Sequence, residues 1–254
     1  MLCGFAVNAI AQIDTIYTNN QAIPCEIKEV DVNFVKYVYE GESVLNSLSK
    51  NVVQKIVYRN GRIQSFAALT SLKKVISVED YENVSIATVE SEILGLFKIG
   101  DVSAKAKGTT ELANQERVKA RAYRKLKIVA AMMGANIIYL TSHRSRGNSM
   151  AFEIATETSI TGVAYSNILP NYSKFQKLIA GKSMKQKTIT YMGGSSSNYQ
   201  QYEDIQPFAI TTIEEHGGLI VINGQYQVTH YDETGFNIYH RTKNRWYNTR
   251  IIFE

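Results

Sequence analysis

Apolar and polar residues between Thr109 and Leu140 follow the period of an α-helix and then the pattern of a buried strand. At about 100° per residue, one face of the helix is apolar, formed by Val118, Ala122, Leu126, Val129 and Met133. The opposite face is basic, formed by Arg117, Arg121, Arg124, Lys125 and Lys127, with Ile128 as the apolar exception among them. We expect Thr109 or Thr110 to cap the start of the helix and Gly134 to end it.

Strands are predicted after this helix and before it. Residues 136–140 are short, apolar and β-branched, and residues 151–165 offer an alternating partner strand. Another strand is expected at residues 84–89. Near the N-terminus, residues 23–30 and 34–39 alternate, and Asn60-Gly61 between residues 55–59 and 62–66 is typical of a two-residue type I′ hairpin.

The C-terminal part of the chain is predicted to be β-rich as well. Residues 172–180 favour a short helix, and the polar residues 193–206 favour a loop or linker. Residues 209–253 read as strands with turns at Asn223-Gly224, near Gly235 and at Lys243-Asn244. Residues 15–37 and 219–239 share an order of strands and turns, which a duplication and convergent hairpin chemistry explain equally well.

These elements predict an α+β fold with three units. A helix-bearing β-α-β-β middle unit of residues 79–170 stands between two small antiparallel β units, residues 12–78 and 209–254. Residues 171–208 would connect the last two units through the short helix and the polar loop.

The first eleven residues carry no charged side chain, and Ala9-Ile10-Ala11 fits the small-x-small rule for signal peptidase cleavage before Gln12. We therefore expect residues 1–11 to be the remnant of a signal peptide, with an ordinary first strand as the alternative. The mature protein would then be exported, periplasmic or associated with the outer envelope. Beyond this segment, no apolar run approaches the roughly 18 residues of a transmembrane helix.

Positive charge is concentrated in the middle unit. The 254-residue chain has a formal net charge of +5, yet residues 98–150 alone hold eleven Lys or Arg against three acids. A solvated charged face is one explanation. A binding surface is the other, with an anionic lipid headgroup, an acidic glycan or a partner protein as ligand, and we expect Ile128 to contact another element or another subunit. Nucleic acid would fit on charge alone, but export argues against it. The candidate surface comprises Arg117, Arg121, Arg124, Lys125, Ile128, His143, Arg144 and Arg146.

Motifs for enzymatic or metal chemistry are missing from the sequence. There is no nucleophile elbow, phosphate loop or dinucleotide fingerprint, so no catalytic residue and no cofactor is predicted. The four His lack metal-ligand spacing; His230 and His240 could face each other across a hairpin, but two ligands do not make a site. Cys25 is expected to be a small buried residue. A non-enzymatic binding or assembly module is the favoured function, and an envelope hydrolase with a fold-assembled acid/His site or a metal-binding protein is the alternative.

Two parts of the chain resemble known families. Residues 14–17, 28–30 and 55–61 form the pattern Asp-x-Ile-Tyr, Lys-x-Val and Lys-Ile-Val-Tyr-x-Asn-Gly, which resembles a module of exported Gram-negative envelope proteins of unknown function. Residues 84–165, with Ala122, Leu126, Gly134 and the closing 162–165 strand, are similar to a small bacterial family described as heavy-metal-binding, whose members have an α+β fold and can form rings. Because this stretch has no Cys and His143 is its only His, the resemblance implies the fold and self-association but not metal binding.

Overall fold

A computed structural model describes residues 13–18, 21–66, 72–108, 114–146 and 156–254. The chain forms two compact units, Met1–Ser71 and Leu72–Glu254, rather than three. The expected signal-peptide remnant, the expected caps Thr109 and Thr110, and the first part of the expected 151–165 strand lie outside the described residues. Within those residues, the structure contains no helix that is both long and apolar enough to span a bilayer.

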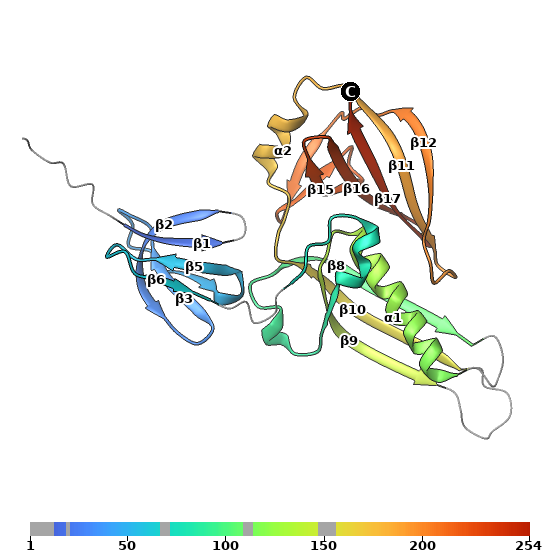
Figure 1. Ribbon diagram of the computed structural model, residues 1–254, viewed down its shortest axis with the longest axis horizontal. Helices are drawn as coiled ribbons and strands as arrows, with labels where there is room; N and C mark the ends of the chain where they lie inside the picture. The colour runs from blue at the N-terminus through green and yellow to red at the C-terminus, as the bar shows by residue number, and fades with distance from the viewer. Residues whose placement is uncertain (1–12, 19–20, 67–71, 109–113, 147–155) are drawn as a thin grey trace, which may run out of the picture. The chain divides into compact units, whose positions relative to one another are not determined.

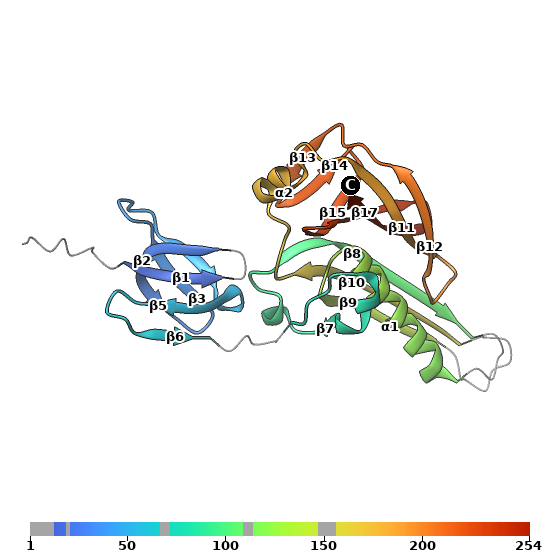
Figure 2. The same cartoon turned by 45° about the horizontal axis from the view of Figure 1, so that its top comes forward.

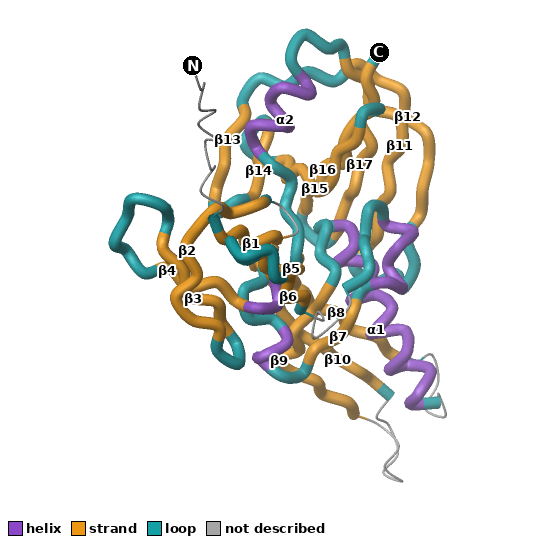
Figure 3. Tube along the Cα trace, turned by 60° about the vertical axis from the view of Figure 1, so that its left-hand side comes forward, coloured by secondary structure: helices purple, strands orange, loops and turns teal. Residues whose placement is uncertain are grey.

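The N-terminal unit is one antiparallel sheet (Figure 3) in the order β4-β3-β2-β1-β5-β6. Its core includes Ile16, Val35, Ile56 and the fully buried Cys25, so the expectation of a buried cysteine is confirmed. The buried Asp14 carboxylate accepts the backbone N–H groups of Ile27 and Arg59 at 3.1 and 2.8 Å, which connects β1 to β2 and to the turn that follows β5. The elements are β1 (Asp14–Thr18), β2 (Ala22–Val30), β3 (Phe34–Val38), β4 (Asn46–Ser49), the 3-10 helix η1 (Lys50–Val52), β5 (Val53–Val57) and β6 (Ile63–Ser65).

The Asn60-Gly61 hairpin is in the predicted place but has a different turn. The Gly61 N–H donates to the Tyr58 carbonyl and the Tyr58 N–H donates to the Arg62 carbonyl, so the loop is longer than two residues. Only Gly61 of the pair has positive φ, at 80°, whereas a type I′ turn needs it at both positions. At Asn223-Gly224 both residues do have positive φ, 52° and 69°, and the Gln225 N–H donates to the Ile222 carbonyl at 3.3 Å, although three residues separate the paired Ile222 and Tyr226.

The second unit begins with a four-stranded sheet in the order β7-β9-β10-β8, antiparallel except for the β7–β9 pair. The long edge strand β8 was not predicted, because its inward side carries Gly100 and Ala104, which have low strand propensity. A Cβ at Gly100 would lie 2.8 Å from Met133 Cε, so a larger residue there would require the end of that methionine side chain to move. The elements are η2 (Val78–Asn83), β7 (Ser85–Ala87), η3 (Glu90–Glu92), β8 (Phe97–Lys107), α1 (Gln115–Met132), β9 (Ile137–Arg146) and β10 (Glu157–Ser166).

A seven-stranded antiparallel sheet completes this unit, in the order β12-β11-β17-β16-β15-β14-β13. It arches, and α2 lies at the end that carries β13 and β14 (Figure 2). The short helix is where the sequence predicts it, but residues 193–206 are not a linker, since β11 and β12 pair within the sheet. The elements are α2 (Tyr172–Ile179), β11 (Met184–Gly193), β12 (Gln200–Pro207), β13 (Ile213–His216), β14 (Leu219–Ile222), β15 (Tyr226–Asp232), β16 (Gly235–Thr242) and β17 (Arg245–Phe253).

Helix α1 packs on the four-stranded sheet and also contacts the seven-stranded one (Figure 1). The five predicted apolar-face residues are all buried, which confirms that face. The end of the helix is held by the other sheet: the side-chain amides of Asn248 and Gln227 donate to the carbonyls of Met132 and Met133 at 2.8 and 3.2 Å. These bonds satisfy carbonyls that a helix end leaves without partners. Gly134, with φ 79°, ends the helix as predicted.

The helix begins later than the sequence suggests. Asn114 is its N-cap, and the Asn114 side chain accepts the N–H groups of Glu116 and Arg117 at 2.8 and 3.2 Å. The fold as a whole is mainly β, with three sheets and a single long helix among the described elements. The C-terminal β unit is therefore larger than expected, and it shares one compact body with the helix-bearing sheet.

Candidate functional site

The predicted basic surface is divided among three places in the structure. Lys125 and Ile128 are buried, at 3% and 0% exposure, so the placement of Lys125 on a solvent-facing side is wrong, whereas the expected contact of Ile128 with another element is confirmed. Ile128 belongs to the core cluster that also contains Met192 of β11 and Trp246 of β17. It thus packs inside its own unit and is not available to a second copy of the chain.

The three arginines of α1 lie outside the core, and two of them have partners. Arg121 Nη2 donates to the Lys107 carbonyl at 2.7 Å, and the Arg124 guanidinium lies 5.4 Å from the Tyr81 ring centre. Arg117 is exposed. His143 of β9 is on the same side of the sheet as the helix, with its ring 5.9 Å from that of Tyr123.

Arg144 and Arg146 are on the other face of the sheet. Residues directly opposite each other in a sheet project to the same side. Arg146 is opposite Glu157, which is opposite Lys107, and Arg144 is opposite Ser159, which is opposite Lys105. By contrast, Ser145, which lies between the two arginines, accepts a hydrogen bond from Gln115 Nε2 of α1 at 3.0 Å and is therefore on the helix side.

These residues define a surface that we call the basic sheet face: Lys105, Lys107, Arg144, Arg146, Glu157, Ser103, Ser142, Ser159 and Thr161. It has four cations and one carboxylate, and its hydroxyl groups lie between the cations and further along the same three strands. Strands lie about 4.8 Å apart, so the β8 lysines and the β9 arginines form two columns about 10 Å apart, with β10 between them. The sequence indicated Arg144 and Arg146, but not the two lysines that the sheet brings opposite them.

Glu157 is the internal counterion of this face. Its two carboxylate oxygens accept from Lys105 at 2.6 Å and Lys107 at 3.3 Å. The hydrogen bond from Lys105 is the main cause of a lowered Glu157 pKa, and Lys107 adds to it. Arg144 and Arg146 have no ion-pair partner among the described side chains, so the β9 column is the one with free charge.

The far end of the same sheet face is covered. Ala87, Ile93 and Ile137 form a small buried cluster there, with Leu96, Tyr139 and Tyr165 packed against it. At the β8 edge of this end, the exposed Lys98 and Asp101 form an ion pair at 3.3 Å.

Lys125 is a second electrostatic feature, inside the fold. Its ammonium donates to the Gly194 carbonyl and lies 5.9 Å from the Trp246 ring centre. Burial lowers the Lys125 pKa. No carboxylate pairs with it among the described residues, so this cation is held by a carbonyl and an aromatic ring alone.

The histidines do not form the cross-strand pair that the sequence allowed. His230 is opposite Asn237, while the His240 ring is stacked 4.7 Å from that of Tyr247, so the two do not face each other. Burial lowers the pKa of both. His216 pairs with Glu214 at 2.8 Å, but both side chains are exposed on edge strand β13. No group of three or more metal-ligating side chains is found within the described residues.

An aromatic row on the seven-stranded sheet was not foreseen. Ring centres 4.7 to 6.2 Å apart connect five neighbouring strands, and the rings are Tyr202, Tyr191, Tyr247, His240 and Tyr226. Cross-strand ring pairs of this kind stabilise a sheet. The alternating tyrosines were visible in the sequence, but their alignment depends on strand register, which no local pattern reports.

The comparisons with known proteins add no relative to this picture: no family model, no curated protein and no solved structure matches the chain.

Proposed function

We propose that this protein is a non-enzymatic, exported binding module of the bacterial envelope, and that the basic sheet face holds an acidic glycan. The observation that carries the proposal is the grouping of four cations around the Glu157 carboxylate at one end of a sheet face. Export is the expectation drawn from the N-terminal residues and from the family resemblance. The proposal transfers the binding role from the helix to the opposite side of the sheet.

A polysaccharide suits this surface better than a membrane does. Surfaces that bind bilayers combine cations with apolar side chains that enter the headgroup region. The basic sheet face offers Ser103, Ser142, Ser159 and Thr161 beside its cations, and hydroxyls of this kind can bond sugar hydroxyls and carboxylates. Two columns about 10 Å apart can contact different acidic groups of one extended chain.

Titration with fluorescent heparin and with polygalacturonate, at increasing NaCl, tests the proposal. We expect binding that weakens with salt because exposed charges are screened. The double variant Arg144→Gln/Lys105→Gln removes one cation from each column. Each lost ion pair with the ligand should cost about 0.7 kcal/mol, so binding should weaken about tenfold.

The matched control is Arg117→Gln with Lys119→Gln, which removes the same charge from α1 and should leave binding within about twofold. Equal losses in the two double variants would mean that only the net charge matters and would overturn the site. Displacement of heparin by duplex DNA at equal charge concentration would overturn the choice of a glycan.

A further inference from the structure

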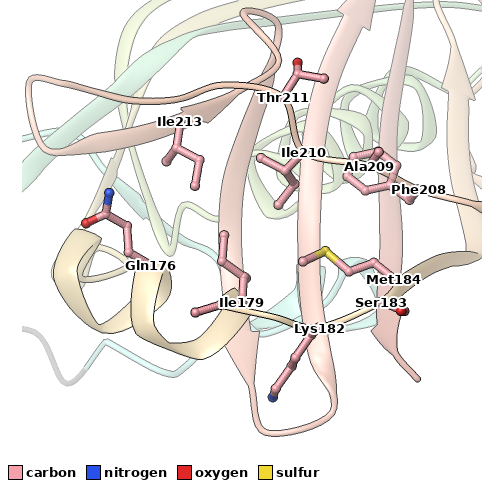
Figure 4. A pocket seen from close by; sticks show the side chains of 11 residues that line it. Gln176, Ile179, Lys182, Ser183, Met184, Phe208, Ala209, Ile210, Thr211 and Ile213 are labelled. Carbon is pink, nitrogen blue, oxygen red and sulfur yellow. The ribbon is translucent and has the colours of Figure 1, made fainter.

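A second site of different chemistry lies beside α2. A pocket of about 560 Å³ opens between this helix and the segment that joins β12 to β13 (Figure 4). Its wall consists mainly of apolar side chains: Ile179, Met184, Phe208, Ile210 and Ile213. Sites for small ligands in proteins usually have such a volume and such a lining.

The pocket wall is held in place before any ligand arrives. Phe208 N–H donates to the Met184 carbonyl at 2.9 Å, and the Asn223 side chain accepts Thr211 N–H at 2.8 Å and donates to the Ala209 carbonyl at 2.9 Å. On the other side, the Tyr172 hydroxyl donates to the Ile213 carbonyl at 3.4 Å. A preformed wall lowers the ordering cost of binding.

The apolar wall of the pocket is the solvent-exposed edge of the hydrophobic core beside the seven-stranded sheet. Phe175, Ile222 and Phe236 are fully buried beneath it, while Met184, Phe208, Ile210 and Ile213 remain partly exposed. These side chains would gain by contact with an apolar group, because burial of apolar surface is favourable.

Charge decides what kind of apolar molecule fits. Lys182 is the only charged residue of the lining. Its ammonium points away from the other lining side chains (Figure 4) and lies 3.9 Å from the ring centre of Phe253, which is outside the lining. No carboxylate lines the pocket. Ser183 and Gln176 place a hydroxyl and an amide at the rim. The interior thus suits an uncharged chain, and the rim suits an acidic head.

We propose that this pocket binds a single-chain amphiphile with an acidic head group, such as a fatty acid, with the chain against Ile179 and Ile210 and the head near Lys182. The site is on a different sheet from the basic sheet face, so either proposal can fail without the other.

Titration with laurate below its micelle concentration, followed by displacement of 1-anilinonaphthalene-8-sulfonate, tests the pocket. Ala209→Trp should fill it and weaken laurate at least about tenfold. Ile205→Trp adds the same ring at an exposed position of β12 outside the lining and should leave laurate binding unchanged. Circular dichroism checks the fold of each variant. Ile210→Gln makes the pocket wall polar without adding bulk and should also weaken laurate binding.

Lys182→Gln tests the head group. It should weaken laurate about fivefold and leave dodecanol unchanged, since only the carboxylate gains from the ammonium. Equal losses with Ala209→Trp and Ile205→Trp, or no laurate binding by the wild type, would overturn the pocket. Unchanged laurate affinity in Lys182→Gln would overturn the acidic head.

Discussion

At the residue scale, Lys125 is the clearest case of a side chain whose environment contradicts its type. It is 3% exposed, bonded to the Gly194 carbonyl and next to Trp246, with no acid paired to it in the described chain. A buried charge without a counterion costs free energy that a hydrophobic side chain of similar volume avoids. The charge of Lys125 therefore destabilises the fold, whereas its long side chain fills space in the core.

Lys125→Met should consequently stabilise the protein by about 1 kcal/mol. The pH dependence supplies a second readout. The Lys125 pKa is lower in the folded protein than in the unfolded chain. The loss of folding free energy caused by burying the charge is therefore complete below the lowered pKa, and it disappears as the pH rises toward 10.5. Urea denaturation at several alkaline pH values should show that the difference in unfolding free energy between variant and wild type shrinks across this range.

Lys127→Met is the control: Lys127 also donates to a carbonyl, that of Glu82 at 3.2 Å, but it is not buried. A loss of stability in Lys125→Met would contradict this account.

If the basic sheet face binds an acidic glycan as proposed, Glu157 competes with that ligand for the lysines. It occupies Lys105 and Lys107 with both carboxylate oxygens. Glu157→Gln should strengthen heparin binding about threefold, because two lysines lose their internal partner. Glu116→Gln removes the same charge from the first turn of α1 and should change the affinity much less. Weaker binding by Glu157→Gln would mean that Glu157 orders the lysines for the ligand instead of competing with it.

At the element scale, α1 organises the second unit because it packs against both sheets. Leu126 is fully buried within the cluster that joins them. Leu126→Asp should unfold this unit, because an unpaired buried carboxylate costs several kcal/mol, comparable with the whole stability of a small domain. An unchanged melting temperature would contradict the packing described here.

A milder change at the same helix tests its start. Asn114→Ala removes the acceptor for two N–H groups and should cost about 1 kcal/mol while the fold remains. Asn171→Ala, at the N-cap of the much shorter α2, gives a comparison within the same protein. An Asn114→Ala variant as stable as the wild type would place the start of the helix elsewhere.

At the scale of the whole molecule, the chain consists of two units with separate cores. The N-terminal core is built around Ile16 and Ile56, and the second unit has its own larger clusters. Residues 72–254 expressed alone should therefore fold cooperatively and keep both the basic sheet face and the α2 pocket. Comparison of laurate and heparin affinities between this fragment and the full chain measures this. An insoluble or partly unfolded fragment would show that the second unit depends on the first.

Local pattern in the sequence determined those features that neighbouring residues control. The apolar face of α1, its end at Gly134, the α2 helix and the Asn223-Gly224 turn all follow from spacing and backbone preference over a few residues. The buried state of Cys25 follows from alternation in β2 in the same way.

Only the tertiary structure decided which polar-face residues are buried and which charges come together. Lys125 and Ile128 are buried because α1 has a second sheet behind it. Ile128 on the basic face indicated a second contact, but nothing in the helix pattern indicated which element supplies it or that Lys125 is buried as well. Arg144 and His143 project to opposite faces, and their neighbours are set by strand register, including a bulge opposite Thr161 and Gly162. Because side chains alternate with a period of two, one extra residue exchanges the faces. The cation array and the pocket thus depend on contacts between residues far apart in the chain.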